Sequence, residues 1–107
     1  MKNKHIYESK ATILKALAHP VRIWIAEELE QNEKCVCEFV NETNLDFSTI
    51  SKHLLVLKNA GIVNDEKRGK QVFYSLKFHC VSNFSKCLTT LIKEQTQEQI
   101  NLFKIQN

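Results

Sequence analysis

Apolar residues recur at helical spacing through most of the chain, with one β-prone stretch after its midpoint. Residues 11–18 are good helix formers. His19-Pro20 then ends that helix and opens a second one, because proline suits the first position of a helix. The second helix carries an apolar stripe of Val21, Trp24, Ile25 and Leu29. A short third helix is expected near residues 36–41, with a turn at residues 43–44 after it.

The segment 47–61 predicts a fourth helix that ends in a glycine stop. Asp46 can cap its first N–H groups, and Gly61 can follow it as a left-handed residue. One face is apolar, with Ile50, Leu54 and Leu57. The opposite face carries Ser48, Thr49, Ser51 and Lys52 near the helix start. A helix that reads the major groove of DNA needs this layout; an ordinary amphipathic surface helix is the alternative.

Two β-prone runs follow, over residues 62–64 and 71–76, with a turn cluster between them. This pattern predicts a β-hairpin. Its tip carries the cations Lys67, Arg68 and Lys70, which suit phosphates or a narrow minor groove. A merely solvated turn is the alternative.

The distribution of charge favours the DNA-binding interpretation. Residues 1–45 hold 6 Lys/Arg and 7 Asp/Glu, residues 46–77 hold 6 and 3, and residues 78–107 hold 3 and 2. The net charge of +3 therefore equals the charge of the expected recognition helix and hairpin. A basic footprint confined to one surface is typical of a DNA-binding protein.

Length and composition predict one small globular domain over residues 1–107, with 43% hydrophobic and 25% charged residues. Two glycines and one proline leave little room for linkers. The polar N-terminus resembles neither a signal peptide nor a membrane span, so we expect a cytoplasmic protein. Four cysteines in that compartment favour metal binding, redox chemistry or simple burial over a structural disulfide framework.

Residues from about 78 to 105 form a long helical pattern. Its apolar positions include Val81, Phe84, Leu88, Leu91 and Ile92. A small domain cannot easily cover so long a stripe by itself, so the pattern predicts a dimerisation helix. A helical tail or a disordered segment are the alternatives.

Four segments in order, residues 16–23, 34–39, 48–61 and 68–76, resemble the ArsR/SmtB winged-helix repressors. The resemblance implies a mainly α fold with a small β-hairpin wing, a winged helix-turn-helix that is dimeric through its terminal helices. It also implies a homodimer that binds a palindromic double-stranded operator without a cofactor. Such a dimer dissociates from DNA when it senses a metal ion, a metalloid or a thiol oxidant.

The resemblance also assigns the DNA contacts. Ser48, Thr49, Ser51 and His53 would face bases or phosphates, and Arg68 and Lys70 would lie in the wing. The position of Phe47 is often a hydrogen-bonding residue such as glutamine in the family, so an apolar contact with a thymine methyl group is expected there instead. The full expected set is Phe47, Ser48, Thr49, Ser51, Lys52, His53, Lys67, Arg68 and Lys70.

Cys35-Val36-Cys37 resembles a motif that arsenic- and cadmium-sensing repressors carry at the start of the third helix. Thiols near a helix N-terminus have depressed pKa values and, as thiolates, bind soft metals such as As(III). Residues i and i+2 of a helix point roughly 200° apart. Joint chelation therefore requires Cys35 to precede the first turn, or the turn to unwind.

The most similar arsenic sensors have a third cysteine where this chain has Val40. A three-coordinate site would then recruit Cys80 or Cys87, from the same or the partner subunit; burial of both as small hydrophobic residues is the alternative. Because seven residues of helix span about 10.5 Å, beyond the roughly 7 Å limit for a disulfide, these two cannot readily pair with each other.

These observations lead to three functional hypotheses. The first is a repressor that senses a thiophilic metalloid or metal through Cys35, Cys37 and a third sulfur from Cys80 or Cys87. The second is the same repressor fold sensing oxidants or reactive sulfur, with Cys35 or Cys37 joined to Cys80 or Cys87. The third, a thiol enzyme, is not favoured, because the chain lacks a Cys-x-x-Cys motif and an evident set of nucleophile, base and orienting residue.

Overall fold

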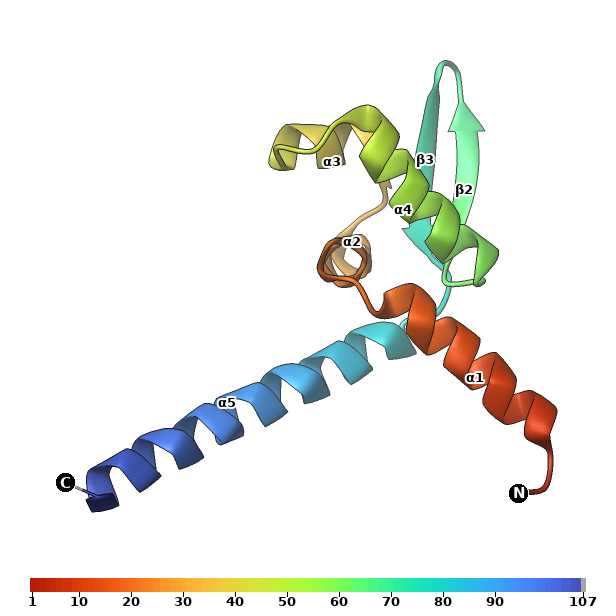
Figure 1. Cartoon of the computed structure of the whole chain (residues 1–107). Coiled ribbons are helices and arrows are strands. Elements are labelled where there is room, and N and C mark those ends of the chain that lie inside the picture. The colour runs from red at the N-terminus through yellow and green to blue at the C-terminus, as the bar shows by residue number, and fades with distance from the viewer. Residues whose placement is uncertain (107) are drawn as a thin grey trace.

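The computed structural model describes residues 1–106 and contains five helices and three short strands within them. In chain order these are α1 (Lys4–Leu17), α2 (Pro20–Gln31), β1 (Lys34–Cys35), α3 (Val36–Glu42), α4 (Phe47–Asn59), β2 (Val63–Arg68), β3 (Gln71–Leu76) and α5 (Cys80–Gln106) (Figure 1). The mainly helical fold with a β-hairpin is therefore confirmed.

The sheet differs from the expected hairpin in two ways. It has three antiparallel strands in the order β1-β3-β2, because Lys34 pairs with Tyr74 and Cys35 with Phe73. A two-residue strand is too short to leave a period-2 pattern in the sequence. In addition, residues 65–68 continue β2, so the expected six-residue turn is only Gly69-Lys70. Charged residues are common on exposed edge strands, where they prevent aggregation, and here their sequence pattern could not be distinguished from that of a turn.

Local capping signals were correct at the predicted helix ends. The Nδ1 atom of His19 accepts a hydrogen bond from the Val21 N–H at 3.1 Å, ahead of Pro20 at the first position of α2. At the end of α4, Gly61 adopts the left-handed conformation with φ +79°, and the Ile62 N–H donates to the Leu57 carbonyl at 3.0 Å. The first bond satisfies an N–H group at the start of α2, and the second satisfies a carbonyl at the end of α4.

One hydrophobic core joins α2, α3, α4 and the sheet. Its fully enclosed side chains are Ile25, Phe39, Ile50, Leu54 and Leu57. Trp24 packs edge-on against Phe39 with ring centroids 5.6 Å apart. Helix α3 and the start of α4 are thus held in a fixed position relative to the sheet. We refer to α2, α3, α4 and the sheet as the body.

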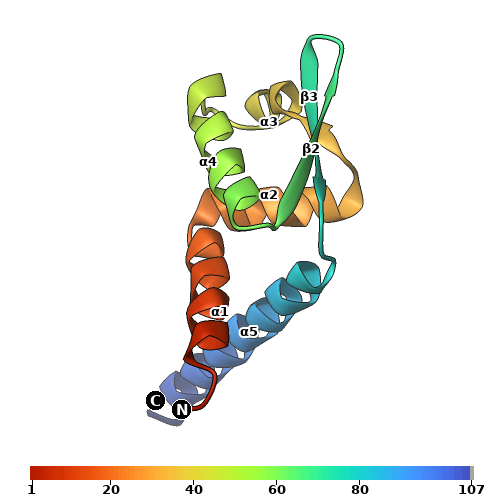
Figure 2. The same cartoon turned by 90° about the vertical axis from the view of Figure 1, so that its right-hand side faces the viewer.

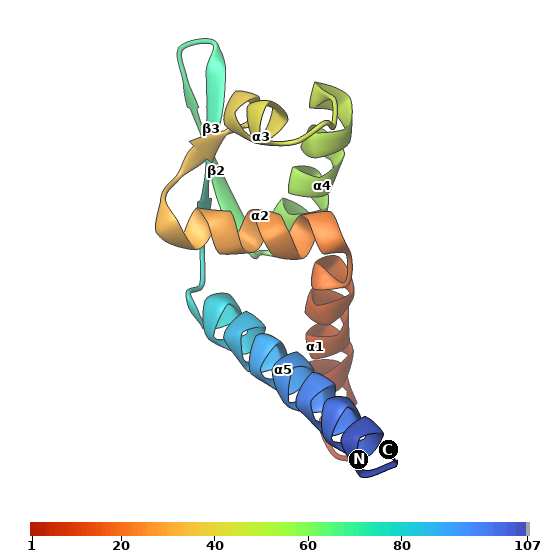
Figure 3. The same cartoon turned by 90° about the vertical axis from the view of Figure 1, so that its left-hand side faces the viewer.

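Helices α1 and α5 extend from the body as two diverging arms, with both chain ends on the side away from the β2–β3 hairpin (Figures 1, 2 and 3). The first turns of α5 rest on α2, where the Ser85 hydroxyl donates to the Glu27 carboxylate and the His79 Nδ1 lies 2.8 Å from a Glu30 oxygen. The remainder of α5 projects outward. In the part of the chain that the structure describes, no helix combines the length and the apolar character that a membrane span requires.

Candidate nucleic-acid interface and thiol site

Helix α4 presents polar residues and one aromatic ring at its N-terminal end. Asp46 caps the helix by accepting from the Thr49 N–H at 2.8 Å. Phe47 is 62% exposed, and Ser48 and Lys52 are exposed as well. Thr49 and Ser51 are half-buried beside them. Because the opposite face of α4 is enclosed in the core, this end is the part of the helix that a DNA groove could accept.

The hairpin formed by β2 and β3, called the wing below, has two kinds of cation at its tip. Lys67 and Lys70 are exposed and form no ion pair with any residue among 1–106. Arg68, in contrast, donates to both oxygens of Glu33 at 2.5 and 3.0 Å and to Glu66 at 2.8 Å. These bonds raise the pKa of the Arg68 guanidinium and lower the pKa of the Glu33 carboxyl.

The positive charge that is available at this surface is therefore smaller than the sequence count indicates. Arg68 is compensated by two carboxylates, and the Lys58 Nζ lies 2.8 Å from Asp65. Lys52, at the start of α4, and Lys67 and Lys70, at the wing tip, form no ion pair within residues 1–106. We define these three lysines with Phe47, Ser48, Thr49 and Ser51 as the DNA face.

His53 occupies a different environment from the rest of the expected DNA contacts. Its ring is half-buried, 4.4 Å from the His19 ring, and its Nδ1 lies 3.3 Å from the Arg22 Nη1. Burial lowers the pKa of His53, and the nearby charges of His19 and Arg22 lower it further. Its position between α2 and α4 suits a role in holding the recognition helix in place.

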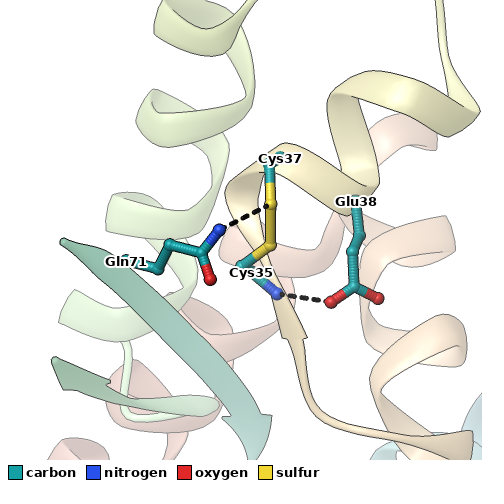
Figure 4. The surroundings of a disulfide bond; sticks show 4 residues. All are labelled: Cys35, Cys37, Glu38 and Gln71. Carbon is teal, nitrogen blue, oxygen red and sulfur yellow. Dashed lines mark hydrogen bonds between the residues drawn. A yellow bond between two sulfur atoms is a disulfide. The ribbon is translucent and has the colours of Figure 1, made fainter. Parts of the chain in front are cut away.

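Cys35 and Cys37 form a disulfide between β1 and the first turn of α3, with Cα atoms 5.3 Å apart (Figure 4). Cys35 has extended backbone, φ −86° and ψ 165°, and precedes the helix. The separation of roughly 200° between residues i and i+2 of a helix does not apply to a residue that lies before the first helical turn. This conformation brings the two sulfurs together, and α3 does not have to unwind. We refer to these residues as the sulfur pair.

The sulfur pair contacts elements on both sides. The Cys35 N–H donates to the Glu38 carboxylate at 3.3 Å, and the Gln71 Nε2 donates to the Cys37 Sγ at 3.7 Å (Figure 4). Cys35 is buried, whereas Cys37 is exposed. A surface hollow here is lined by Cys35, Val36, Cys37, Phe47, Ser51, Lys70, Gln71, Val72 and Tyr74. The sulfur pair, the start of α4 and the wing therefore share one hollow.

An ion-pair cluster secures the strand that carries Cys35. The Lys34 Nζ lies 2.8 Å from both Glu28 and Glu42, which raises the pKa of Lys34. Its side chain is 11% exposed. The sequence pattern did not indicate the roles of Glu33 and Gln71, because their partners lie 35 and 34 residues away in the chain. Lys34 was not indicated either, because its partners belong to two other helices.

Cys80 and Cys87 lie on α5 and are both exposed, so they are not buried as small hydrophobic residues. Among residues 1–106, no three side chains of His, Cys, Asp or Glu gather into a group that could hold a metal. The redox hypothesis paired Cys35 or Cys37 with a cysteine of α5, and this pairing is not the one observed. The physical reason is that Cys35 and Cys37 are brought together by the extended backbone before α3, whereas α5 packs on α2.

The helix pair α3–α4 followed by a hairpin that flanks α4 defines the class of winged helix-turn-helix proteins. Residues 19–65 match the family described as "Bacterial regulatory protein, arsR family". The HTH-type transcriptional repressor SmtB of Mycobacterium tuberculosis is 38% identical over 76 residues, which are 71% of this chain and 56% of that protein. The chain belongs to the arsR family of bacterial regulatory proteins.

Two further similarities bear on the site. The cadmium resistance transcriptional regulatory protein CadC homolog of Staphylococcus aureus is 43% identical over 67 residues, 62% of this chain and 55% of that protein. The homodimeric winged helix-turn-helix DNA-binding domain of Mb0332 from Mycobacterium bovis superposes with a TM-score of 0.75 at 25% identity, covering 87% of this chain and 86% of that one. The chain thus spans about half the length of the SmtB and CadC relatives. All three are described as regulators or as a DNA-binding domain.

Proposed function

We propose that the chain is a homodimeric transcriptional repressor that binds operator DNA and releases it when a thiophilic metal or metalloid binds the reduced sulfur pair. The observation that carries this proposal is the shared hollow: Cys35 and Cys37 lie beside Phe47, at the start of α4, and Lys70, at the wing tip. A ligand at the sulfurs is therefore adjacent to both elements that would hold DNA.

The DNA face supplies the contacts. The start of α4 enters the major groove, where the hydroxyls of Ser48, Thr49 and Ser51 reach base edges or phosphates. Phe47, as an exposed ring, packs on a thymine methyl group. Lys52, Lys67 and Lys70 bind phosphates, which position the protein without reading sequence.

A second copy of the chain is the proposed partner of the arms. A groove between α1, α2 and α5 is lined mostly by apolar side chains, including Leu14, Leu17, Ile23, Val81, Phe84 and Leu88. Exposed apolar side chains continue along α5 at Leu91 and Ile92, and contiguous exposed apolar surface is typical of interaction sites. The Mb0332 domain, which has the same fold, is described as homodimeric.

The inducer step requires free thiols. A reductant supplies two electrons and two protons, and the disulfide becomes the thiols of Cys35 and Cys37. Loss of their protons leaves two thiolates for one soft ion such as As(III) or Cd²⁺. One chain offers no third sulfur next to them, so a three-coordinate site takes Cys80 or Cys87 of the partner subunit, or an external thiol.

A second candidate function is favoured by the disulfide itself. In this alternative the inducer is an oxidant, such as a peroxide or a polysulfide. It accepts two electrons and two protons from the Cys35 and Cys37 thiols and leaves them bonded as in the structure. The dithiol form would then bind DNA, and the disulfide form would release it.

Titration of a fluorescent operator complex distinguishes the two candidates. Fully reduced protein is treated with arsenite, Cd²⁺, Zn²⁺ or a polysulfide, and operator affinity is measured alongside the mass of the protein. Release by arsenite or Cd²⁺ that is lost in Cys35→Ser and Cys37→Ser supports the metal sensor. Cys80→Ser and Cys87→Ser are the matched controls on α5, and loss of release in either identifies the third ligand.

Release by polysulfide without bound metal, with the mass of a bonded or sulfur-bridged cysteine pair, would replace the metal sensor by the redox sensor. Release that persists in Cys35→Ser and in Cys37→Ser would remove the sulfur pair from both candidates.

The DNA face is tested by Lys52→Ala. Each phosphate contact contributes about −0.9 to the slope of log K against log salt. Loss of one contact per protomer should therefore flatten the slope by about 2 for a dimer and weaken binding to many sequences alike. Lys93→Ala, on the exposed surface of α5, is the control; equal slopes in the two variants would place DNA elsewhere.

A further inference from the structure

The wing tip contacts the segment that carries the sulfur pair at two points. Arg68 and Gln71 are directly opposed in the β2–β3 register and flank the Gly69-Lys70 turn. Arg68 holds Glu33, two residues before Cys35, through both of its carboxylate oxygens. Gln71 donates to the Cys37 Sγ. One residue pair of the wing thus contacts both ends of segment 33–37.

Little else positions this end of the wing. Strand β2 is exposed from residue 64 onward, and β1 pairs with β3 only at Tyr74 and Phe73. Between Phe73 and the tip, the strands β2 and β3 pair only with each other within residues 1–106, and the Arg68 guanidinium lies 4.8 Å from the centroid of the Phe73 ring. The contacts of Arg68 and Gln71, together with the half-buried Val72, therefore set the direction of the tip.

We infer that the wing tip is the element that responds to the state of the sulfur pair, with Gln71 and Glu33 as the positioning residues that couple the two. This inference rests on the proposed function and adds the route from sulfur to DNA. In the reduced protein, an ion bound between the Cys35 and Cys37 thiolates uses the Cys37 sulfur lone pair that Gln71 contacts. The Gln71 amide then loses its hydrogen bond to Cys37, and the adjacent Lys70 shifts away from the DNA phosphate that it binds.

The Glu33 contact determines how far this movement extends. While Arg68 remains bound to Glu33, the wing follows the segment that carries Cys35. Coupling between two sites is measured by the ratio of DNA affinities without and with the ion. Removing either positioning residue should reduce this ratio and should leave ion binding itself unchanged.

Two variants test the coupling, and each is compared with the parent in its reduced form. Gln71→Leu removes the amide donor without adding a sulfur atom, and Glu33→Gln keeps the shape of the side chain but removes its charge. Asn64→Ala, which removes an exposed amide at the base of the same hairpin, is the control. Cadmium ion is the probe: its thiolate absorbance reports binding, and operator fluorescence anisotropy reports release.

Gln71→Leu and Glu33→Gln should bind Cd²⁺ like the parent but should bind the ion-free operator more weakly than the parent does, because the contacts that direct Lys70 toward DNA are already absent. Their affinity ratio without and with Cd²⁺ should fall by about tenfold, whereas Asn64→Ala keeps the parent ratio. Parent-like ratios in both variants would overturn the inference. If the parent itself binds Cd²⁺ at the sulfur pair without releasing DNA, the proposed function fails first, and the inference falls with it.

Discussion

The body and the arms of this protein differ in how far their apolar side chains are buried. In the body, Ile50, Leu54 and Leu57 of α4 are 0% exposed. On α5, Leu91 is 49% exposed and Ile92 is 61% exposed. The body is thus a closed folding unit within one chain, whereas the arms display a stripe that a single chain leaves uncovered. The comparison shows that amphipathic helices with similar patterns can serve a core or an interface, depending on what lies next to them.

The largest expected effect comes from the closed core. Leu54→Ala should lower the free energy of unfolding by about 2–5 kcal/mol, because it removes buried methyl groups and leaves a cavity. Urea denaturation at two protein concentrations measures this loss, which should be the same at both. Leu91→Ala is the counterpart on the arms, and its effect should depend on concentration. A concentration-dependent loss in Leu54→Ala would contradict the view that the body folds within one chain.

A charge on the open surface should break the dimer and spare the body. Phe84→Glu places a carboxylate in the groove between α1, α2 and α5, and we expect dimer affinity to fall by tenfold or more, about 1.4 kcal/mol or above. Sedimentation measures the association, and circular dichroism checks the fold. Asn83→Glu adds the same charge at the neighbouring exposed position. An unchanged dimer in Phe84→Glu would show that this groove is not the interface.

The helix stop in the body has a smaller predicted cost. Gly61→Ala should reduce stability by about 1 kcal/mol, because a side chain is strained in the left-handed conformation. No atom lies within 4 Å of the added Cβ, so crowding does not contribute. Thermal denaturation measures the change. Gly69→Ala, with φ +62° at the wing tip, tests the same strain outside the core, and a cost at neither position would refute the backbone argument.

The smallest predicted effect is a loss of folding stability at acidic pH. Burial lowers the pKa of His53 in the folded protein below its ordinary value of 6.5. Below about pH 6.5 the unfolded chain therefore binds more protons than the folded protein does. The contribution of His53 to the free energy of unfolding is fully present above about pH 6.5 and is lost as the pH falls through the lowered pKa. His53→Gln should flatten this part of the stability profile in denaturation series between pH 7 and 5. A parent profile that rises on acidification would contradict the sign.

Much of the body was predictable because its signals are local. Periodicity placed α4 and its buried face, and Asp46 and Gly61 marked the ends of that helix within one turn of the residues they serve. The start of α2 at Pro20 was likewise a matter of adjacent residues. Helix boundaries depend on hydrogen bonds between residues three to five positions apart, so the sequence alone can indicate them.

The candidate site was only partly predictable because its contacts join distant residues. Arg68 is 35 residues from Glu33, Gln71 is 34 from Cys37, and Arg22 is 31 from His53. By itself, the sequence indicated the five helices, the basic segment and the two closely spaced thiols, although α1 begins at Lys4 and not near residue 11 as expected. Only the tertiary structure decided that β1 would join the sheet and place Cys35 before its helix. It also decided that Arg68 would pair with two carboxylates, whereas Lys67 and Lys70 form no ion pair within residues 1–106. The physical reason is that pairing between distant residues depends on how the whole core packs, and this packing cannot be inferred from the residues of one short segment.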